Sequence, residues 1–400
     1  MTAPTGPLPS YPFPPASGLD PPERLAELRA REPVTRVEFD GRPAWLLTRH
    51  ADIRAVLVDP RFAPYIPGVP MDPDEANNTG MLFLMHGAPH ARLRRVLAAA
   101  LSARRIAALR PAVQRLADTA LAELTAHGPP RDLMCGFARP LAAGTLSELL
   151  GVALRERPGF EEMITDVHAL FTTHDTAELA QRGQQLAGFL ARLVAERRAE
   201  PGPDLLSELV TATDEHGTAL TESEVHGLTF SLLGAGLVPP AQALTLAALR
   251  LLLDPAAGNA LRQDPGRLPA AVEELLRLDP AGAGSTDRSL RASAEVDVAG
   301  VRITAGEIVV VSLGAANRDP AEFPEPQALR LSRTANRHLS FAPGQHHCLG
   351  AALARLQLEI GLGTLLANLP AFALATDSTA LDWRHGMLGA RNLAALPVTW

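Results

Sequence analysis

Helical periodicity dominates this chain and restricts the folds that it can adopt. Apolar residues recur with helical spacing, between Pro and Gly breaks, at roughly 89–107, 112–126, 141–150, 176–199, 223–253 and 269–278. Strand patterns are sparse and confined to residues 296–303, 307–313 and 394–400, apart from a strand, turn and helix over 43–63 that stops at Asp59-Pro60. The sequence therefore predicts a mainly α fold with a small β part.

The size and the absence of internal boundaries suggest one unit. No internal repeat, low-complexity tract or interdomain linker is visible in the 400 residues, so we expect a single domain over 1–400 that starts with a proline-rich leader, 1–20. Hydrophobic residues make up 46% and charged residues 20%, which is typical of a soluble globular protein. The N-terminus lacks the pattern of a signal peptide, and no stretch of transmembrane length is free of polar interruption. We expect a cytoplasmic protein that is not bound to a membrane.

The ionisable residues exclude several classes of protein. All 37 basic residues are arginine, so a Schiff-base lysine, a pyridoxal phosphate anchor and a P-loop lysine are excluded. A net charge of -7 argues against a nucleic-acid-binding protein. The two cysteines, Cys135 and Cys348, lie far apart in sequence and form no C-x-x-C motif, which excludes a disulfide framework and a four-cysteine zinc site.

Cys348 stands in the most informative segment, residues 338–366. A Pro-Gly loop presents Cys348, and a long apolar helix is predicted to begin directly after Gly350. A thiolate beside a helix N-terminus is stabilised by the helix dipole and by free N–H groups. Two alternatives are a buried, inert cysteine and a metal site made by His346, His347 and Cys348, although adjacent residues rarely chelate one ion.

The spacing around Cys348 resembles one family loop. Phe341, Gly344, His346, Cys348 and Gly350 reproduce the F-x-x-G-x-H-x-C-x-G pattern of the cytochrome P450 family. The resemblance extends from about residue 43 to the C-terminus and is strongest to soluble bacterial members. It implies the fold of that family, a triangular prism in which haem b (iron protoporphyrin IX) lies between a long central helix and the helix after the cysteine loop.

The resemblance also implies roles for these residues. Cys348 would be the axial ligand of the haem iron, and its electron donation would favour O–O bond cleavage. Phe341 would pack against the haem near the sulfur, the glycines would allow close backbone approach, and His346 would contact a propionate. Ala342 stands where a glycine is usual, which a small residue tolerates if its φ is negative.

A second resemblance is the E-x-x-R pair Glu274 and Arg277, which share one helix face. Alone, such a pair is usually solvated, but its place ahead of the cysteine loop implies the structural pair behind the haem. The family usually adds an arginine at the position of Ala328. Either Arg330 or Arg333 takes its place here, or the network has only two members.

Arginines and histidines elsewhere resemble the family's propionate contacts. His90 and Arg94 are four residues apart and lie on one helix face, and arginine binds carboxylates through two parallel hydrogen bonds. A further propionate arginine is expected near residues 285–296. We choose Arg288, with Arg291 as the alternative.

The long helix over 223–253 departs from the family pattern. It opens with a capping box at Thr221 and Glu224. In the family, an A-G-x-[DE]-T-T sequence in this helix supplies the acid and the alcohol that deliver protons to iron-bound dioxygen. Here Ala235 and Gly236 are followed by Leu237, Val238, Pro239 and Pro240, so that Val238 and Pro239 occupy the acid and alcohol positions.

The two prolines have a local consequence. Proline lacks an N–H, so Pro239 and Pro240 free the carbonyls of Ala235 and Gly236. We expect a kinked groove lined by acceptors that could hold a water or a substrate N–H. These four positions, 235, 236, 238 and 239, are our candidates for the oxygen-side catalytic segment.

Several reactions remain open. The enzyme could hydroxylate with a substrate hydroxyl or ordered water as proton relay, use peroxide, or carry out atypical chemistry such as oxidative coupling or ring formation. The missing pair could also be drift without mechanistic meaning. A haem-free auxiliary binding protein is a further alternative, which the retained cysteine loop and haem contacts argue against.

By resemblance, the substrate pocket draws on residues 67–84, 232–238, 281–285 and 386–388. The candidates are Leu232, Leu237, Ala283, Met387 and Leu388, mostly aliphatic or small, with core packing as the alternative for each. They predict an apolar, medium-sized organic substrate. The high Ala, Arg and Pro content resembles actinobacterial proteins, in which such monooxygenases often tailor secondary metabolites.

The family precedent for electron supply is an NAD(P)H-dependent ferredoxin reductase and a ferredoxin, a small acidic iron–sulfur protein that docks on the cysteine side. The candidates for the basic docking face are Arg92, Arg95, Arg104 and Arg105, of which Arg92 and Arg95 could equally belong to an ordinary surface helix. A substrate carried on a carrier protein is a further option.

Overall fold

The computed structural model describes residues 7–14, 19–66, 75, 77, 79–151, 163, 167, 176–280, 287–385 and 391–400. Its longer helices are α1 (Glu23–Arg31), α2 (His50–Val58), α4 (Gly87–Ala100), α6 (Arg110–Thr125), α7 (Arg139–Leu150), α9 (Thr176–Ala199), α11 (Glu222–Leu253), α12 (Pro255–Gln263), α13 (Leu268–Leu278) and α15 (Ala351–Asn368). Shorter helices are α5 (Ala103–Ala108), α10 (Leu205–Val210) and α14 (Leu313–Ala316), and a π-helical turn, Met134–Ala138, precedes α7. The expected mainly helical fold is confirmed.

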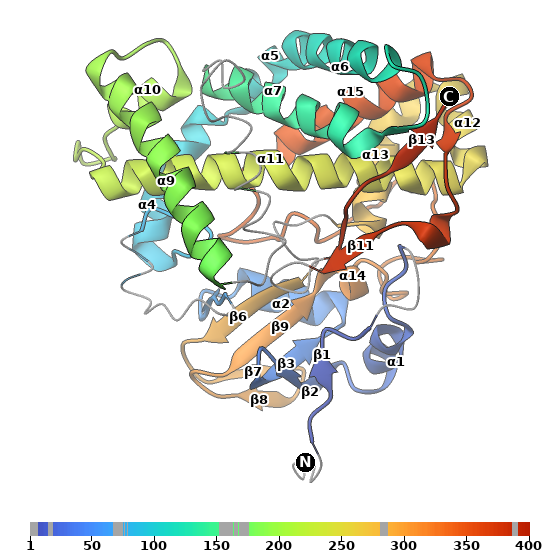
Figure 1. Ribbon diagram of the computed structural model, residues 1–400. Coiled ribbons are helices and arrows are strands. Elements are labelled where there is room, and N and C mark those ends of the chain that lie inside the picture. The colour runs from blue at the N-terminus through green and yellow to red at the C-terminus, as the bar shows by residue number, and fades with distance from the viewer. Residues whose placement is uncertain are drawn as a thin grey trace.

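The largest sheet lies beside the N-terminus, below α11 in Figure 1. A six-stranded sheet has the order β1-β2-β3-β9-β6-β4, from strands β1 (Ser10–Tyr11), β2 (Val34–Phe39), β3 (Arg42–Leu47), β4 (Phe62–Pro64), β6 (Asp287–Ala292) and β9 (Ile308–Ser312). Smaller sheets pair β7 (Val296–Val298) with β8 (Val301–Ile303), β11 (Trp383–His385) with β12 (Arg391–Leu393), and β13 (Pro397–Thr399) with both β10 (Ala373–Leu374) and β5 (Arg131–Asp132). Strand β3 pairs in parallel with β9, so segments more than 250 residues apart in sequence lie side by side in one sheet.

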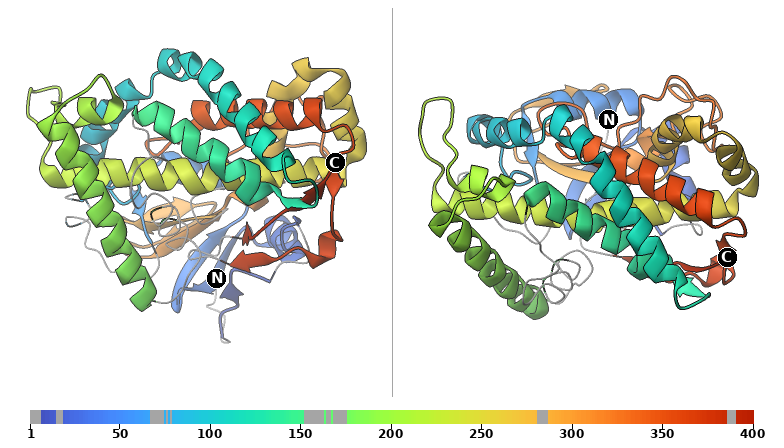
Figure 2. Two further views of the ribbon diagram at one scale, coloured as in Figure 1. Left: turned by 45° about the horizontal axis from the view of Figure 1, so that its top comes forward. Right: turned by 90° about the horizontal axis from the view of Figure 1, so that it is seen from above.

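Helix α11 crosses the whole molecule, with α7 and α15 packed along it (Figures 1 and 2). The predicted capping box is confirmed, because Thr221 Oγ1 accepts from the Glu224 N–H at 3.2 Å and Glu224 Oε2 accepts from the Thr221 N–H at 2.8 Å. Among the described residues, this helix alone has the length and composition of a membrane span, but 78% of its most apolar window is buried inside the protein. Such burial is that of a core helix.

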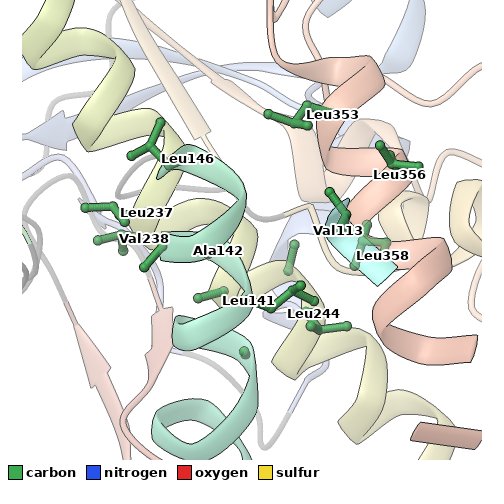
Figure 3. Packing of buried hydrophobic residues seen from close by; sticks show 14 of the residues in the cluster. Val113, Leu141, Ala142, Leu146, Leu237, Val238, Leu244, Leu353, Leu356 and Leu358 are labelled. Carbon is green, nitrogen blue, oxygen red and sulfur yellow. The ribbon is translucent and has the colours of Figure 1, made fainter. Parts of the chain in front are cut away.

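The main hydrophobic core lies where α7, α11, α15 and α6 meet. Figure 3 shows Leu141 and Leu146 of α7 against Leu237, Val238 and Leu244 of α11. All five side chains are buried, so the middle of α11 is held in place by aliphatic packing.

Candidate functional site

The loop that carries Cys348 is fixed by backbone hydrogen bonds and by one glycine. The Cys348 N–H donates to the Phe341 carbonyl at 2.9 Å, and the His347 N–H donates to the Gly344 carbonyl at 3.0 Å. Gly344 has a φ of +89°, and a Cβ there would lie 2.6 Å from the Leu57 carbonyl oxygen in α2. Only glycine fits this contact, so the loop is clamped against α2.

Helix α15 begins at Ala351, with Gly350 as its N-cap residue, so the prediction of a helix directly after Gly350 is confirmed. Burial raises the pKa of the Cys348 thiol, while the Gly350 N–H and the charges of Arg288 and Arg94 act in the opposite direction. In the described part of the chain, no three His, Cys, Asp or Glu side chains group as metal ligands. The alternative of a chelate from His346, His347 and Cys348 therefore finds no support.

The condition that we set for Ala342 is not met. Its φ is +48°, in the left-handed region, and its side chain is buried. The residue follows a tight turn in which its own N–H donates to the Leu339 carbonyl at 2.8 Å. The turn needs a positive φ, so the alanine adopts a backbone conformation that glycine would adopt at lower cost.

A group of basic side chains faces the cysteine loop. The rings of His90 and His346 lie 4.2 Å apart, and His86 stacks on His346 at 5.7 Å. Burial, together with neighbouring positive groups, lowers the pKa of His90 to about 4 and that of His346 to about 3. Arg94 donates to the His347 carbonyl at 2.6 Å. His86 escaped the sequence analysis, although it stands four residues before His90.

Arg288 and Arg94 lack a carboxylate partner among the described residues. Desolvation lowers the pKa of both guanidinium groups, and negative charge on the Cys348 sulfur opposes this effect. Arg291, the alternative to Arg288, instead places its guanidinium over the Tyr65 ring at 5.2 Å. Cations without counter-charges, beside a thiol, suit a ligand that brings its own carboxylates and a metal that takes sulfur.

Glu274 and Arg277 form a fully buried pair at 2.7 Å, with both side chains 0% exposed. Arg333 completes the network, because its Nε donates to both oxygens of Glu274, at 3.0 and 3.1 Å. Arg330 contributes only its backbone N–H, at 3.0 Å, while its side chain pairs with Glu325 on the surface. The question left open by the sequence is thus answered in favour of Arg333.

Glu273 and Arg355 form a second ion pair, which supports the cysteine loop. Glu273 accepts from Arg355 Nε at 2.6 Å and from Arg355 Nη2 at 2.9 Å, and it lies 3.2 Å from His338 Nε2. The Arg355 guanidinium lies over the Phe341 ring, 4.6 Å from its centre. Arg355 of α15 therefore covers the Phe341 ring of the loop. The sequence analysis missed Glu273 and Arg355, which are 82 residues apart.

The middle of α11 has one accessible face. Ala235 is exposed and Gly236, Pro239 and Pro240 are partly exposed, although Leu233 and Gly234 just before them are buried. The helix continues through both prolines from Glu222 to Leu253, and Figure 1 shows no pronounced bend. The expected kink is therefore wrong, because packing on both sides of the prolines holds the helix straight.

The candidate pocket residues have different positions. Leu232, Leu237 and Val238 are buried members of the main core, which favours the packing alternative for them. Ala283, Met387 and Leu388 lie outside the described residues, as does part of the segment 67–84.

The end of that segment crosses α11 closely. A Cβ on Gly227 would lie 2.0 Å from the Thr79 carbonyl oxygen, so this crossing requires glycine. Just beyond it, Phe83 is 43% exposed, with its ring 6.4 Å from that of Phe230. An exposed aromatic side chain thus lies beside Phe230 of the long helix.

Three of the four arginines expected to dock a redox partner are already paired. Arg92 binds Asp214 and Glu224, Arg95 binds Glu215, and Arg105 binds Glu208. Arg104 is exposed and has no ion-pair partner among the described residues. These pairs join α4 and α5 to α10, to the loop after it and to the first turn of α11, and they neutralise most of the expected basic face.

Comparisons with known proteins agree with this geometry. A family model described as "Cytochrome P450" matches residues 17–379. The chain is 38% identical to nocardicin C N-oxygenase of Nocardia uniformis subsp. tsuyamanensis and 39% identical to mycinamicin IV hydroxylase/epoxidase of Micromonospora griseorubida, each over 98% of both chains. A solved structure, the LnmA cytochrome P450 hydroxylase from the leinamycin biosynthetic pathway of Streptomyces atroolivaceus, matches with a TM-score of 0.88 and 34% identity, over 98% of this chain and 100% of the other.

Proposed function

Because this chain belongs to the cytochrome P450 family, we propose that it is a haem-thiolate monooxygenase that hydroxylates or similarly oxidises an apolar, medium-sized secondary metabolite. Its relatives include an N-oxygenase, a hydroxylase/epoxidase and a hydroxylase from the leinamycin biosynthetic pathway. We assign residues 1–400 to a single domain in the cytoplasm.

The residues present fit haem b. In this proposal Cys348 is the iron ligand, and Phe341, Gly344 and Gly350 shape the loop around the sulfur. The carboxylate-free group of His90, Arg94, Arg288 and His346 would hold the two propionates. The two guanidinium cations of this group lack counter-charges in the described structure, which supports the assignment. When bound, the haem iron supplies activation of dioxygen and transfer of one oxygen atom to the substrate.

The protein residues support that chemistry in distinct ways. The Gly350 N–H and the nearby guanidinium groups stabilise negative charge on the Cys348 sulfur. Arg355, Glu273 and His338 fix Phe341, while Glu274, Arg277 and Arg333 fix the segment that leads into the loop. The exposed face of α11 at Ala235 and Pro239 borders the substrate chamber in this proposal, with the loop around Phe83 as a second wall.

Proton delivery is substrate- or water-assisted. The side chains of Val238 and Pro239 carry no proton that they could donate, so they replace the family's acid and alcohol without replacing their chemistry. The same observation favours a second candidate, atypical oxidation such as coupling, ring formation or peroxide-driven turnover. Parallel assays with dioxygen and with peroxide on a small compound panel distinguish the two.

The cysteine loop is the observation that most strongly supports the proposed function, and absorption spectroscopy tests whether Cys348 binds the iron. We expect the reduced, carbon monoxide-bound protein to show the long-wavelength Soret band of thiolate ligation. Cys348→Ser abolishes this band, whereas Cys135→Ser, which changes the other cysteine, retains it. A purified protein without haem absorbance, despite haem supply, would instead support the auxiliary binding protein.

Electron supply from a ferredoxin and its reductase gives a test of the docking face. Since Arg92, Arg95 and Arg105 are engaged in ion pairs, we assign docking to Arg104. Arg104→Glu should lower ferredoxin-supported turnover several-fold and leave peroxide-driven turnover unchanged. Equal loss in both assays contradicts a docking role.

A further inference from the structure

Two consecutive prolines remove the α-helical hydrogen-bond partner of one carbonyl in α11. In an α-helix the carbonyl of Ala235 accepts from the N–H four residues on, but that residue is Pro239. The N–H five residues on, which could substitute in a wider turn, is also missing because that residue is Pro240. Gly236 differs, since the N–H of Ala241 stands five residues beyond it. The chemistry therefore singles out the Ala235 carbonyl.

The surroundings of Ala235 leave that carbonyl accessible. Helical carbonyls point toward the C-terminal end, so the oxygen of Ala235 lies on the face between Ala235 and Pro239, and both residues are accessible. Gly236 is turned toward α7 instead, because a Cβ there would lie 3.0 Å from Leu146 Cδ1.

Side chains do not compensate for the missing bond. Elsewhere in α11, hydroxyl groups donate back to helix carbonyls, as Ser231 does to Gly227 at 2.8 Å and Thr245 does to Ala241 at 2.8 Å. Over the described residues, no side chain donates to the carbonyl of Ala235. An accessible carbonyl in a largely apolar wall is a strong acceptor, because a partner there gains a hydrogen bond shielded from bulk water.

We propose that the Ala235 carbonyl accepts a hydrogen bond from the substrate, and that the enzyme selects apolar compounds that carry an N–H or O–H group near the oxidised atom. This inference rests on the proposed function, which places the exposed face of α11 at the substrate chamber. It assigns to the backbone a selective contact that the side chains of Val238 and Pro239 cannot make.

Matched variants of the holoenzyme isolate this contact. Pro239→Ala restores the N–H that would donate to the Ala235 carbonyl within the helix. Pro240→Ala is the control, because the α-helical acceptor of its new N–H is the Gly236 carbonyl, so the Ala235 carbonyl still lacks the N–H four residues on. Three probe pairs differ in the donor: indole and 1-methylindole, phenol and anisole, and aniline and N,N-dimethylaniline. The readout is the dissociation constant of each probe from calorimetric titration, which requires no turnover.

For at least one pair, we expect the wild-type protein and Pro240→Ala to bind the donor compound about five-fold more tightly than its methylated partner, the effect of one net hydrogen bond. In Pro239→Ala this preference falls to near unity. A donor preference that is absent from every pair, or that Pro239→Ala leaves unchanged, overturns the inference.

The carbon monoxide spectrum of each variant separates this result from the proposed function. A thiolate-type band with no change in donor preference refutes the carbonyl contact alone. Absence of the band in the wild-type protein refutes the haem-thiolate assignment, and the contact with it.

Discussion

Replacing Arg333 tests whether it, and not Arg330, completes the buried network around Glu274. The Arg333 side chain is 7% exposed and donates to both carboxylate oxygens of a residue that is fully buried. The Arg330 side chain is 45% exposed, and its partner Glu325 is 66% exposed. The comparison of Arg333→Met with Arg330→Met therefore sets a buried ion pair against a surface one.

The loss of stability expected for Arg333→Met depends on the hydrogen-bond partners that Glu274 keeps. Breaking a buried ion pair costs about 3–5 kcal/mol when the remaining charge is left alone. In Arg333→Met, Glu274 keeps Arg277 at 2.7 and 2.8 Å and the Asn336 amide at 3.1 Å. We therefore expect a smaller loss of roughly 2–3 kcal/mol, against about 0–1 kcal/mol for Arg330→Met, whose backbone N–H contact survives.

Thermal unfolding of the holoprotein, followed by the Soret band and by far-ultraviolet circular dichroism, measures both changes. Arg333→Met should lower the midpoint by about 3–6 °C, and Arg330→Met by about 1 °C or less. An equal fall in the two variants, or a larger one for Arg330→Met, would refute the reasoning, because solvent-exposed charge would then matter as much as the buried contact.

Two other predictions concern the cysteine loop and its support. Ala342→Gly relieves the strain of the positive φ, but it removes a buried methyl group and raises the entropy of the unfolded chain. We therefore expect its free energy of unfolding to lie within about 1 kcal/mol of wild type. Ala271 is fully buried inside α13, and Ala271→Gly should lower the free energy of unfolding by about 2 kcal/mol. Urea titration measures the free energy of unfolding of both variants. An equal loss at the two positions would contradict the inference that Ala342 is strained. Burial raises the pKa of Glu273, but hydrogen bonds from Arg355 and His338 outweigh it and hold that pKa at about 2, against 4.5 for a free carboxyl group. Its contribution, up to about 3 kcal/mol, is therefore present above pH 4.5 and lost as the pH falls toward 2, so the stability difference between wild type and Glu273→Gln should shrink below pH 4.5; a difference that is constant with pH would contradict the assignment.

Local patterns in the sequence predicted most of the helices. The prediction for residues 176–199 matches α9 at both ends, and that for 269–278 misses one residue of α13. Such stretches are bounded by Pro, Gly or capping residues that act over a few positions. The predicted helix over 89–107 instead divides into α4 and α5, because Leu101 and Ser102 interrupt it without a Pro or Gly to mark the break.

Interactions between distant residues were the part that the sequence could not reveal. Glu274 and Arg277 were visible because they are three residues apart, but the choice of Arg333 over Arg330 depends on how the loop after Pro324 folds back. The conformation of Ala342 depends likewise on the turn that surrounds it, and no property of alanine itself indicates a positive φ.

The distribution of charge connects the fold to the proposed cofactor. The chain has 44 acidic residues against 37 arginines, so carboxylates are not scarce, and arginines such as Arg250 and Arg355 form two-pronged pairs with Asp279 and Glu273. Arg94 and Arg288 lie near Cys348 and are desolvated, but neither has a carboxylate partner in the described structure. Two desolvated guanidinium groups without a carboxylate partner leave this site electrostatically incomplete. Binding of a dicarboxylate cofactor would remove that imbalance, so haem binding and stability of the folded protein should be coupled.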